Sequence, residues 1–202
     1  MNTISMTKVS ASTAAEICRG VALGAEATAR LKERQTAGEF LAVLAQAGLH
    51  ADACRFLAHA LPKREAVCWA CLCLRQSGIP LAPKAAAALE AAETWVREAT
   101  DETRRAAFPA AEAAEFGTPA GCAALAAFLS GGSLAPAHLP AVPPKEHLTA
   151  TAVIGSLTLA AVSLDPARAP EQYRKFLGIG LEIARGERPC GVNPPQFAAR
   201  VS

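Results

Sequence analysis

The segment that most constrains the fold is an uncharged run, LTATAVIGSLTLAAVSL, at residues 148–164. An apolar run of this length is either a helix buried in a protein core or, at the short limit, a helix that spans a membrane. Its threonines, serines and glycine, together with the lack of flanking aromatic anchors, favour the first alternative. The sequence therefore predicts a buried core helix here and no membrane span.

The rest of the chain is also strongly helical in character. Alanine, the residue with the highest intrinsic helix propensity, occurs 48 times in 202 residues, while aromatic residues make up only 5%. No clean fixed-period repeat is present. We therefore expect an all-α single domain of about eight helices in a paired antiparallel arrangement, either an irregular bundle or a short solenoid-like array.

The expected domain organisation is a flexible N-terminal tail at 1–10, a helical domain at 11–187 and a C-terminal tail at 188–202. Within the domain, residues 130–147 are rich in proline and glycine and predict a surface loop. A loop of this length is either disordered or held in place for a reason. The sequence does not decide between the two.

Several local signals predict helix boundaries. Thr36 and Glu39 have the spacing of a capping box. Asp101 is in position to cap the helix that is expected to begin directly after it. Pro62 follows closely on an amphipathic helix and suits the first turn of another, so we expect these two helices to form an antiparallel pair. Pro109 predicts a kink or break.

Net charge gives little functional information. Lysine and arginine total 20 against 18 acidic residues, so no general attraction to nucleic acid or acidic membranes is expected. The first twenty residues lack the continuous apolar core of a secretory signal, which predicts a cytoplasmic protein.

The seven cysteines, an odd number, lack the regular spacing of a disulfide framework, which predicts reduced thiols. On a helical wheel Cys68 and Cys71 lie about 60° apart, but Cys73 lies about 140° from Cys68, so the three cannot share one metal ion. The run around them is apolar and predicts buried structural cysteines, with no cofactor or metal. The competing hypothesis is a thiol-dependent redox or metal-binding module centred on Cys68, Cys71 and His59.

Charged residues supply the remaining candidates. Lys63 and Arg64 stand in the first turn of the cysteine-bearing helix, where positive charge opposes the helix dipole unless a partner such as Glu65, Glu93 or Glu102 offsets it. Arg104 and Arg105 lack a glycine-rich phosphate loop, so a solvated face is favoured over an anion site. No catalytic signature is present. The candidate partner-binding residues are Lys63, Arg64, Glu65, Arg104, Arg105, Ser133, Leu134 and His138.

Four stretches resemble an uncharacterised family of small helical bacterial proteins: RFLAHALPKREAVCWACLCLR (55–75), TRRAA (103–107), TPAGCAALAAFLSGGSLAP (118–136) and VPPKEHLTATAVIGSLTLAA (142–161). The family pattern includes FLAHALPKREAVWWAC and SGGSLAP, and the resemblance covers roughly residues 36–165. This chain has Cys68 where the pattern has a second tryptophan, so that cysteine is not part of the family pattern. Some members are encoded near type VI secretion components such as spike and tip proteins.

The resemblance implies a non-enzymatic protein-binding factor: an accessory, adaptor or chaperone-like protein of a type VI secretion system. Its expected partner is another protein, either a secretion cargo, a tip protein or a toxin. An immunity protein that binds a cognate toxin has the same physical profile. We expect Lys63 to Glu65 and the 130–147 loop to supply the contact surface.

Overall fold

Ten α-helices and one 3₁₀ helix form the regular structure of the residues that this computed structural model describes, which are 6–9, 13–136 and 138–190. Two helices have five residues and the other eight have ten or more, which confirms the predicted all-α domain. In chain order they are α1 (Ala14–Cys18), α2 (Ala25–Ala29), α3 (Ala37–Gln46), α4 (His50–Ala60), α5 (Lys63–Gln76), α6 (Pro83–Glu98), α7 (Asp101–Ala113), α8 (Pro119–Phe128), α9 (Leu148–Val162), η1 (Pro166–Arg168) and α10 (Ala169–Arg185).

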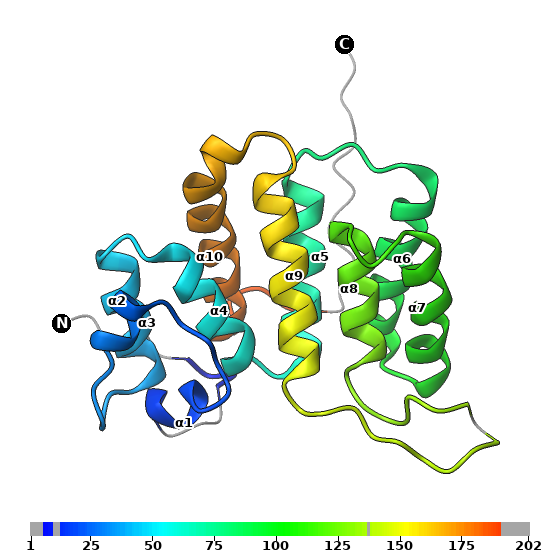
Figure 1. The fold of residues 1–202 in the computed structure, drawn as a ribbon, viewed down its shortest axis with the longest axis horizontal. Helices are drawn as coiled ribbons and strands as arrows, with labels where there is room; N and C mark the ends of the chain where they lie inside the picture. Colours follow the sequence, from blue (N-terminus) through cyan, green and yellow to red (C-terminus); the bar gives the residue numbers. More distant parts are fainter. Residues whose placement is uncertain (1–5, 10–12, 137, 191–202) are drawn as a thin grey trace.

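Helices α5 and α9 pack against each other in the middle of the molecule (Figure 1). Helices α6, α7 and α8 lie on one side of them, and α1 to α4 with α10 lie on the other. Helix α4 packs mainly on α10, α3 and α9, so the predicted antiparallel pairing of α4 with α5 is wrong. The reason is the extended backbone at Leu61 and Pro62, which turns the chain between the two helices.

The predicted capping box is present at the start of α3. Thr36 Oγ1 accepts a hydrogen bond from the Glu39 amide at 3.2 Å, and Glu39 Oε2 accepts one from the Thr36 amide at 2.9 Å. The cap of α7, in contrast, is Thr100, whose Oγ1 accepts from the Thr103 amide at 3.1 Å. Asp101 is the first helical residue, so its predicted capping role is wrong.

Helix α7 continues through Pro109 without a break. Ala107 and Ala111, on either side of the proline, are both fully buried. Packing on both sides of Pro109 therefore outweighs the loss of one backbone hydrogen bond at the ring.

The predicted buried helix at 148–164 is confirmed as α9, whose Val153, Ser156 and Leu157 are buried. Its buried hydroxyl groups reach the two ends of α8: Ser156 Oγ donates to the Pro119 carbonyl at 2.8 Å, and Thr149 Oγ1 donates to the Leu129 carbonyl at 2.9 Å. Within the described part of the chain, no single helix is long and apolar enough to cross a bilayer. Helix α9 and the segment Pro166–Arg185 are long and apolar enough only when taken together, and they are bent by 118° relative to each other.

The N-terminal segment of the described chain lies against the end of α10. Thr7 Oγ1 donates to the Arg185 carbonyl at 3.0 Å, and the Lys8 amide donates to the Ala184 carbonyl at 3.1 Å. Residues 6–9 of the predicted N-terminal tail therefore lie against the end of α10. The rest of that tail, 1–5 and 10, lies outside the described residues, as do residues 191–202 of the predicted C-terminal tail.

Trp69 joins α5 to α10 in the core. Its indole is fully buried, and Nε1 donates to the Phe176 carbonyl at 2.7 Å, which satisfies its one polar atom. Gly180, one turn further along α10, faces the same ring: a Cβ atom there would lie 2.7 Å from Trp69 Cε2 and 2.6 Å from Leu57 Cδ2. The absence of a side chain at Gly180 allows α10 to approach α5 closely.

This contact predicts opposite effects for two glycines of α10. Gly180→Ala should lower the free energy of unfolding by about 1–3 kcal/mol, because the new methyl group overpacks the Trp69 site. Gly178→Ala, which meets open space on the exposed face of the same helix, should raise it by about 0.5–1 kcal/mol through helix propensity. Urea unfolding followed by circular dichroism measures both, and equal values for the two variants would contradict the close approach.

Candidate functional site

The eight predicted contact residues all lie toward one end of the helical domain. Helices α5, α7 and α9 begin there, α6 and α8 end there, and the 130–147 loop projects from it, at the bottom of Figure 1. We call this region the loop end and define it by residues 62–65, 96–105 and 128–148. The structure thus brings together candidates from three separate parts of the sequence.

Arg104 is the buried centre of the loop end. Its side chain is only 4% exposed, and Nε donates to Asp101 Oδ1 at 2.8 Å. Nη1 donates to the Phe128 carbonyl at 2.8 Å and Nη2 to the Ser133 carbonyl at 3.1 Å, while the guanidinium lies 5.1 Å from the centre of the Phe128 ring. The predicted solvated face is therefore wrong for Arg104, which binds the end of α8 and the start of the loop to α7.

Arg105 holds the next part of the loop. Its Nε donates to Asp101 Oδ2 at 2.8 Å and its Nη1 to the Ala135 carbonyl at 3.1 Å, with the side chain 31% exposed. Hydrogen bonds from Arg105 and Arg104, in that order, lower the pKa of Asp101 below its usual value. Asp101 thus stays ionised at neutral pH and orients both guanidinium groups.

Gly132 allows the loop to pass next to Arg104. Its φ of +61° lies in the left-handed region that favours glycine, and a Cβ atom there would lie 2.8 Å from Arg104 Nη2. A side chain at this position would therefore meet both backbone strain and a steric clash.

Ser133 closes the loop on itself. Its Oγ accepts hydrogen bonds from the amides of Ala135 at 3.1 Å and Val142 at 3.0 Å, and the Leu134 amide donates to the Val142 carbonyl at 2.8 Å. Residues 134–142, which we call the lobe, therefore start and end at one point (Figure 1). The described residues of this segment form a loop held by specific hydrogen bonds, and the Ser133 side chain joins its two ends.

The lobe presents apolar side chains to solvent. Leu134 is 36% exposed, and Leu139 and Val142 are each 51% exposed. His138 is exposed beside them. Sequence reasoning named Leu134 and His138 but missed Leu139 and Val142, because their exposure depends on how Ser133 closes the loop rather than on local pattern.

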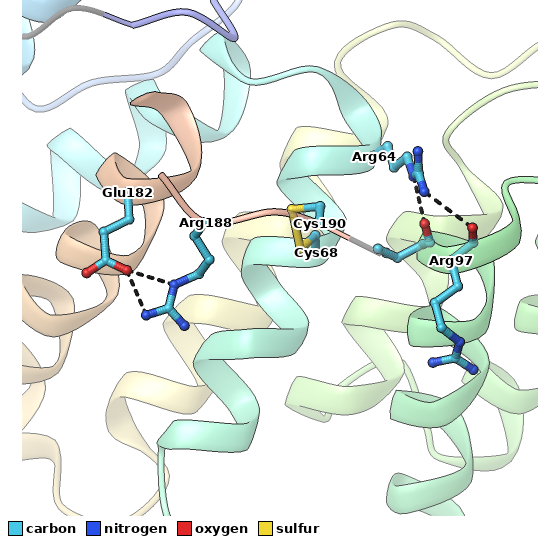
Figure 2. The surroundings of a disulfide bond; sticks show 7 residues. Arg64, Cys68, Arg97, Glu182, Arg188 and Cys190 are labelled. Atoms are coloured by element: carbon cyan, nitrogen blue, oxygen red, sulfur yellow. Dashed lines mark hydrogen bonds and ion pairs between the residues drawn. A yellow bond between two sulfur atoms is a disulfide. The ribbon is translucent and has the colours of Figure 1, made fainter. Parts of the chain in front are cut away.

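Arg64 has a partner that the sequence did not reveal. Its Nε donates to the Val96 carbonyl at 2.6 Å and its Nη2 to the Arg97 carbonyl at 3.3 Å, both in the last turn of α6 (Figure 2). A cation at a helix C-terminus interacts favourably with the helix dipole. Glu93, one of the expected carboxylate partners, instead pairs with Arg75 at 2.7 Å. Lys63 and Glu65 are partly exposed next to this contact.

His59 lies near the start of α9. Burial, and secondarily the charge of His147, lower the pKa of its imidazole below the usual value. His59 is therefore neutral at pH 7. Among residues 6–9, 13–136 and 138–190, no group of three or more histidine, cysteine or acidic side chains is placed to hold a metal ion.

The cysteines depart from the sequence prediction at one pair. Cys68 forms a disulfide with Cys190, with a Cα–Cα distance of 5.9 Å, so the expectation of reduced thiols is wrong for these two (Figure 2). A separation of 122 residues carries no local signal of pairing. Cys71 and Cys73 are buried as predicted, and burial raises the pKa of both thiols.

Residues 40–184 match a protein family described as a family of unknown function, DUF6931, and the chain belongs to this family. The matched region contains Trp69, Arg104 and the whole lobe, whereas Cys190 lies outside it. Comparison with curated proteins and with solved structures found no match. The family membership confirms the resemblance to an uncharacterised family, and its description names no activity.

The two neighbouring arginines of α7 give a matched test of the loop end. Arg104→Leu should lower the free energy of unfolding by about 2–4 kcal/mol, because it leaves the buried Phe128 carbonyl and the partly buried Ser133 carbonyl without their donor. Arg105→Leu removes the same charge from a more exposed site and should cost below about 1 kcal/mol. Urea unfolding compares the two variants, and equal losses would contradict the buried role of Arg104.

Proposed function

We propose that this protein is a non-enzymatic binding factor for another protein and that the loop end is its contact surface. The observation that carries the proposal is the lobe, which is held by Arg104, Arg105 and Ser133 while Leu139 and Val142 remain half exposed. Apolar residues grouped on one surface are typical of interaction sites.

The way the lobe is held favours binding on energetic grounds. Association normally costs free energy because loops and side chains lose conformational freedom. The hydrogen bonds from Arg104 and Arg105 to the loop carbonyls already fix the start of this segment in the free protein. A partner that contacts Leu139 and Val142 therefore meets a surface that is already formed.

The loop end resembles an interface in composition. It contains the exposed apolar residues of the lobe together with the partly or fully exposed polar side chains of Lys63, Glu65 and His138. Protein interfaces commonly combine an apolar centre with a polar, solvated rim. Mixed charges at the rim favour a partner surface of mixed polarity over a nucleic acid or an acidic membrane.

We assign this binding role to a type VI secretion system, as an accessory, adaptor or chaperone-like protein. The support is the resemblance to bacterial proteins of which some are encoded near spike and tip components. The partner in this proposal is a secretion cargo, a tip protein or a toxin. The runner-up is an immunity protein, which uses the same kind of surface to cap a toxin.

The lobe supplies the direct test of binding. The double variant Leu139→Asp and Val142→Asp should weaken binding of a partner captured from the native host by at least about tenfold, because it places two charges in the apolar contact. Leu164→Asp is the matched control, since Leu164 is 57% exposed but follows α9 at the end away from the loop. Isothermal titration with the purified partner measures both.

Two outcomes of that titration would contradict the proposal. Unchanged affinity in the lobe variant would remove the lobe from the interface, and equal weakening by Leu164→Asp would show that any added charge acts nonspecifically.

To separate the adaptor role from the immunity role, the partner is expressed in a sensitive host with and without this protein. Rescue of growth identifies an immunity protein, whereas stabilisation or loading of a harmless partner identifies an adaptor.

A further inference from the structure

The segment that follows α10 crosses to α5 as a short strap, which we define as residues 186–190 (Figure 2). It begins at Gly186, whose φ of +77° ends the helix. The Glu187 amide donates to the Glu182 carbonyl at 2.9 Å, and Arg188 Nε donates to Glu182 Oε2 at 2.7 Å. The strap then ends at Cys190, bonded to Cys68.

We propose that the Cys68–Cys190 pair is a thiol–disulfide exchange site, at which a dithiol reductant attacks Cys190 and releases the strap from α5. The assignment rests on the unequal exposure of the two residues: Cys190 is partly exposed, whereas Cys68 is only 5% exposed. Attack on a disulfide requires access to one sulfur atom along the bond. Cys190 Sγ is therefore the electrophile, and Cys68 Sγ is the leaving group.

The exchange balances as a two-electron reduction. A thiolate of the dithiol forms a bond to Cys190 Sγ while the bond between the two protein sulfurs breaks, and Cys68 leaves as a thiolate that takes up a proton. The second thiol of the reductant, as its thiolate, then attacks the mixed disulfide and displaces Cys190, which also takes up a proton. The products are two protein thiols and one oxidised, cyclic disulfide of the reductant.

Release is local because little else holds the strap. Gly186, Glu187 and Pro189 are exposed, so the strap buries few side chains. Without the disulfide, its side-chain ties beyond the helix cap are the ion pairs of Arg188 with Glu182 and of Glu187 with Arg185, all with side chains between 33% and 57% exposed, and the packing of Cys190 against the core. Ion pairs at such positions contribute little to stability. The helical core, in contrast, is held by contacts that do not involve residues 186–190, such as Trp69 with Phe176.

The remaining cysteines keep the exchange confined to this pair. Cys54, Cys71, Cys73 and Cys122 are buried, and burial raises the pKa of each thiol above its usual value. The pKa of Cys18 is raised by burial as well. Since the thiolate is the species that attacks a disulfide, these thiols do not compete for the Cys68–Cys190 bond at neutral pH.

The strap is close to the loop end but independent of the proposed binding function. Cys68 follows Arg64 by one helical turn on α5, and both appear together in Figure 2. Reduction therefore detaches the strap from α5 one helical turn from the Arg64 contact with α6. This consequence holds whether or not the lobe binds a partner.

The test compares oxidised and dithiothreitol-treated full-length protein. Mass spectrometry after native alkylation should show two added labels on reduction, at Cys68 and Cys190. Limited trypsin digestion should cleave after Arg185 at least about tenfold faster in the reduced protein, because cleavage requires local release of the strap. Circular dichroism should show the same helix content in both states.

Cys190→Ser is expected to behave like the reduced protein with or without dithiothreitol, while Cys122→Ser, which removes a thiol elsewhere, should keep the full redox response. The proposal is overturned if the oxidised protein contains no disulfide, or if trypsin cleaves after Arg185 at equal rates in both states. It is also overturned if reduction unfolds the whole domain, since the bond is then a structural staple. Partner binding is not used as a readout, so these outcomes are separate from the test of the lobe.

Discussion

The buried guanidinium of Arg104 is the constraint on which the architecture of the loop end depends. A positive charge that is almost fully removed from water must be surrounded by acceptors. Three parts of the chain supply them: the first turn of α7, the last turn of α8 and the start of the loop. Moving any one of them leaves a buried donor unsatisfied, so the positions of the three are fixed together.

Small side chains determine how the helices surround α8. Eight of its ten residues are buried, and they are mostly alanine and glycine. Helices α6, α7 and α9 therefore all pack closely on α8. A similar close approach occurs at Gly155 of α9, where a Cβ atom would lie 3.3 Å from Cys122 Sγ. Alanine in this protein is thus a packing residue as much as a helix former.

Local signals in the sequence predicted those features that depend on neighbouring residues. The capping box of Thr36 and Glu39 and the uncharged helix at 148–164 are of this kind, because a few adjacent side chains determine them. The direction of α5 after Pro62 and the continuity of α7 through Pro109 depend on packing between distant helices. Composition and periodicity carry no information about such contacts.

The sequence named several residues of the loop end, but it revealed neither their contacts nor the exposed Leu139 and Val142. The sequence singled out Arg104 and Ser133, yet apart from Asp101 and the Phe128 ring their partners are backbone carbonyls and amides, which no side-chain pattern encodes. The pairing of Cys68 with Cys190 was hidden for a related reason, since one sits in an apolar helix and the other in a segment without periodicity. Tertiary structure alone brings these atoms together.

The disulfide also determines how the protein responds to mechanical tension. When the chain is pulled from its two ends, force passes directly from Cys68 to Cys190 through the sulfur–sulfur bond. Residues 69–189, which include the last eight of the fourteen residues of α5 and all of α6 to α10, carry no tension while that bond is intact. Helices α1 to α4 lie outside the covalent ring and are therefore the part of the structure that extends first when force is applied to the two ends of the chain.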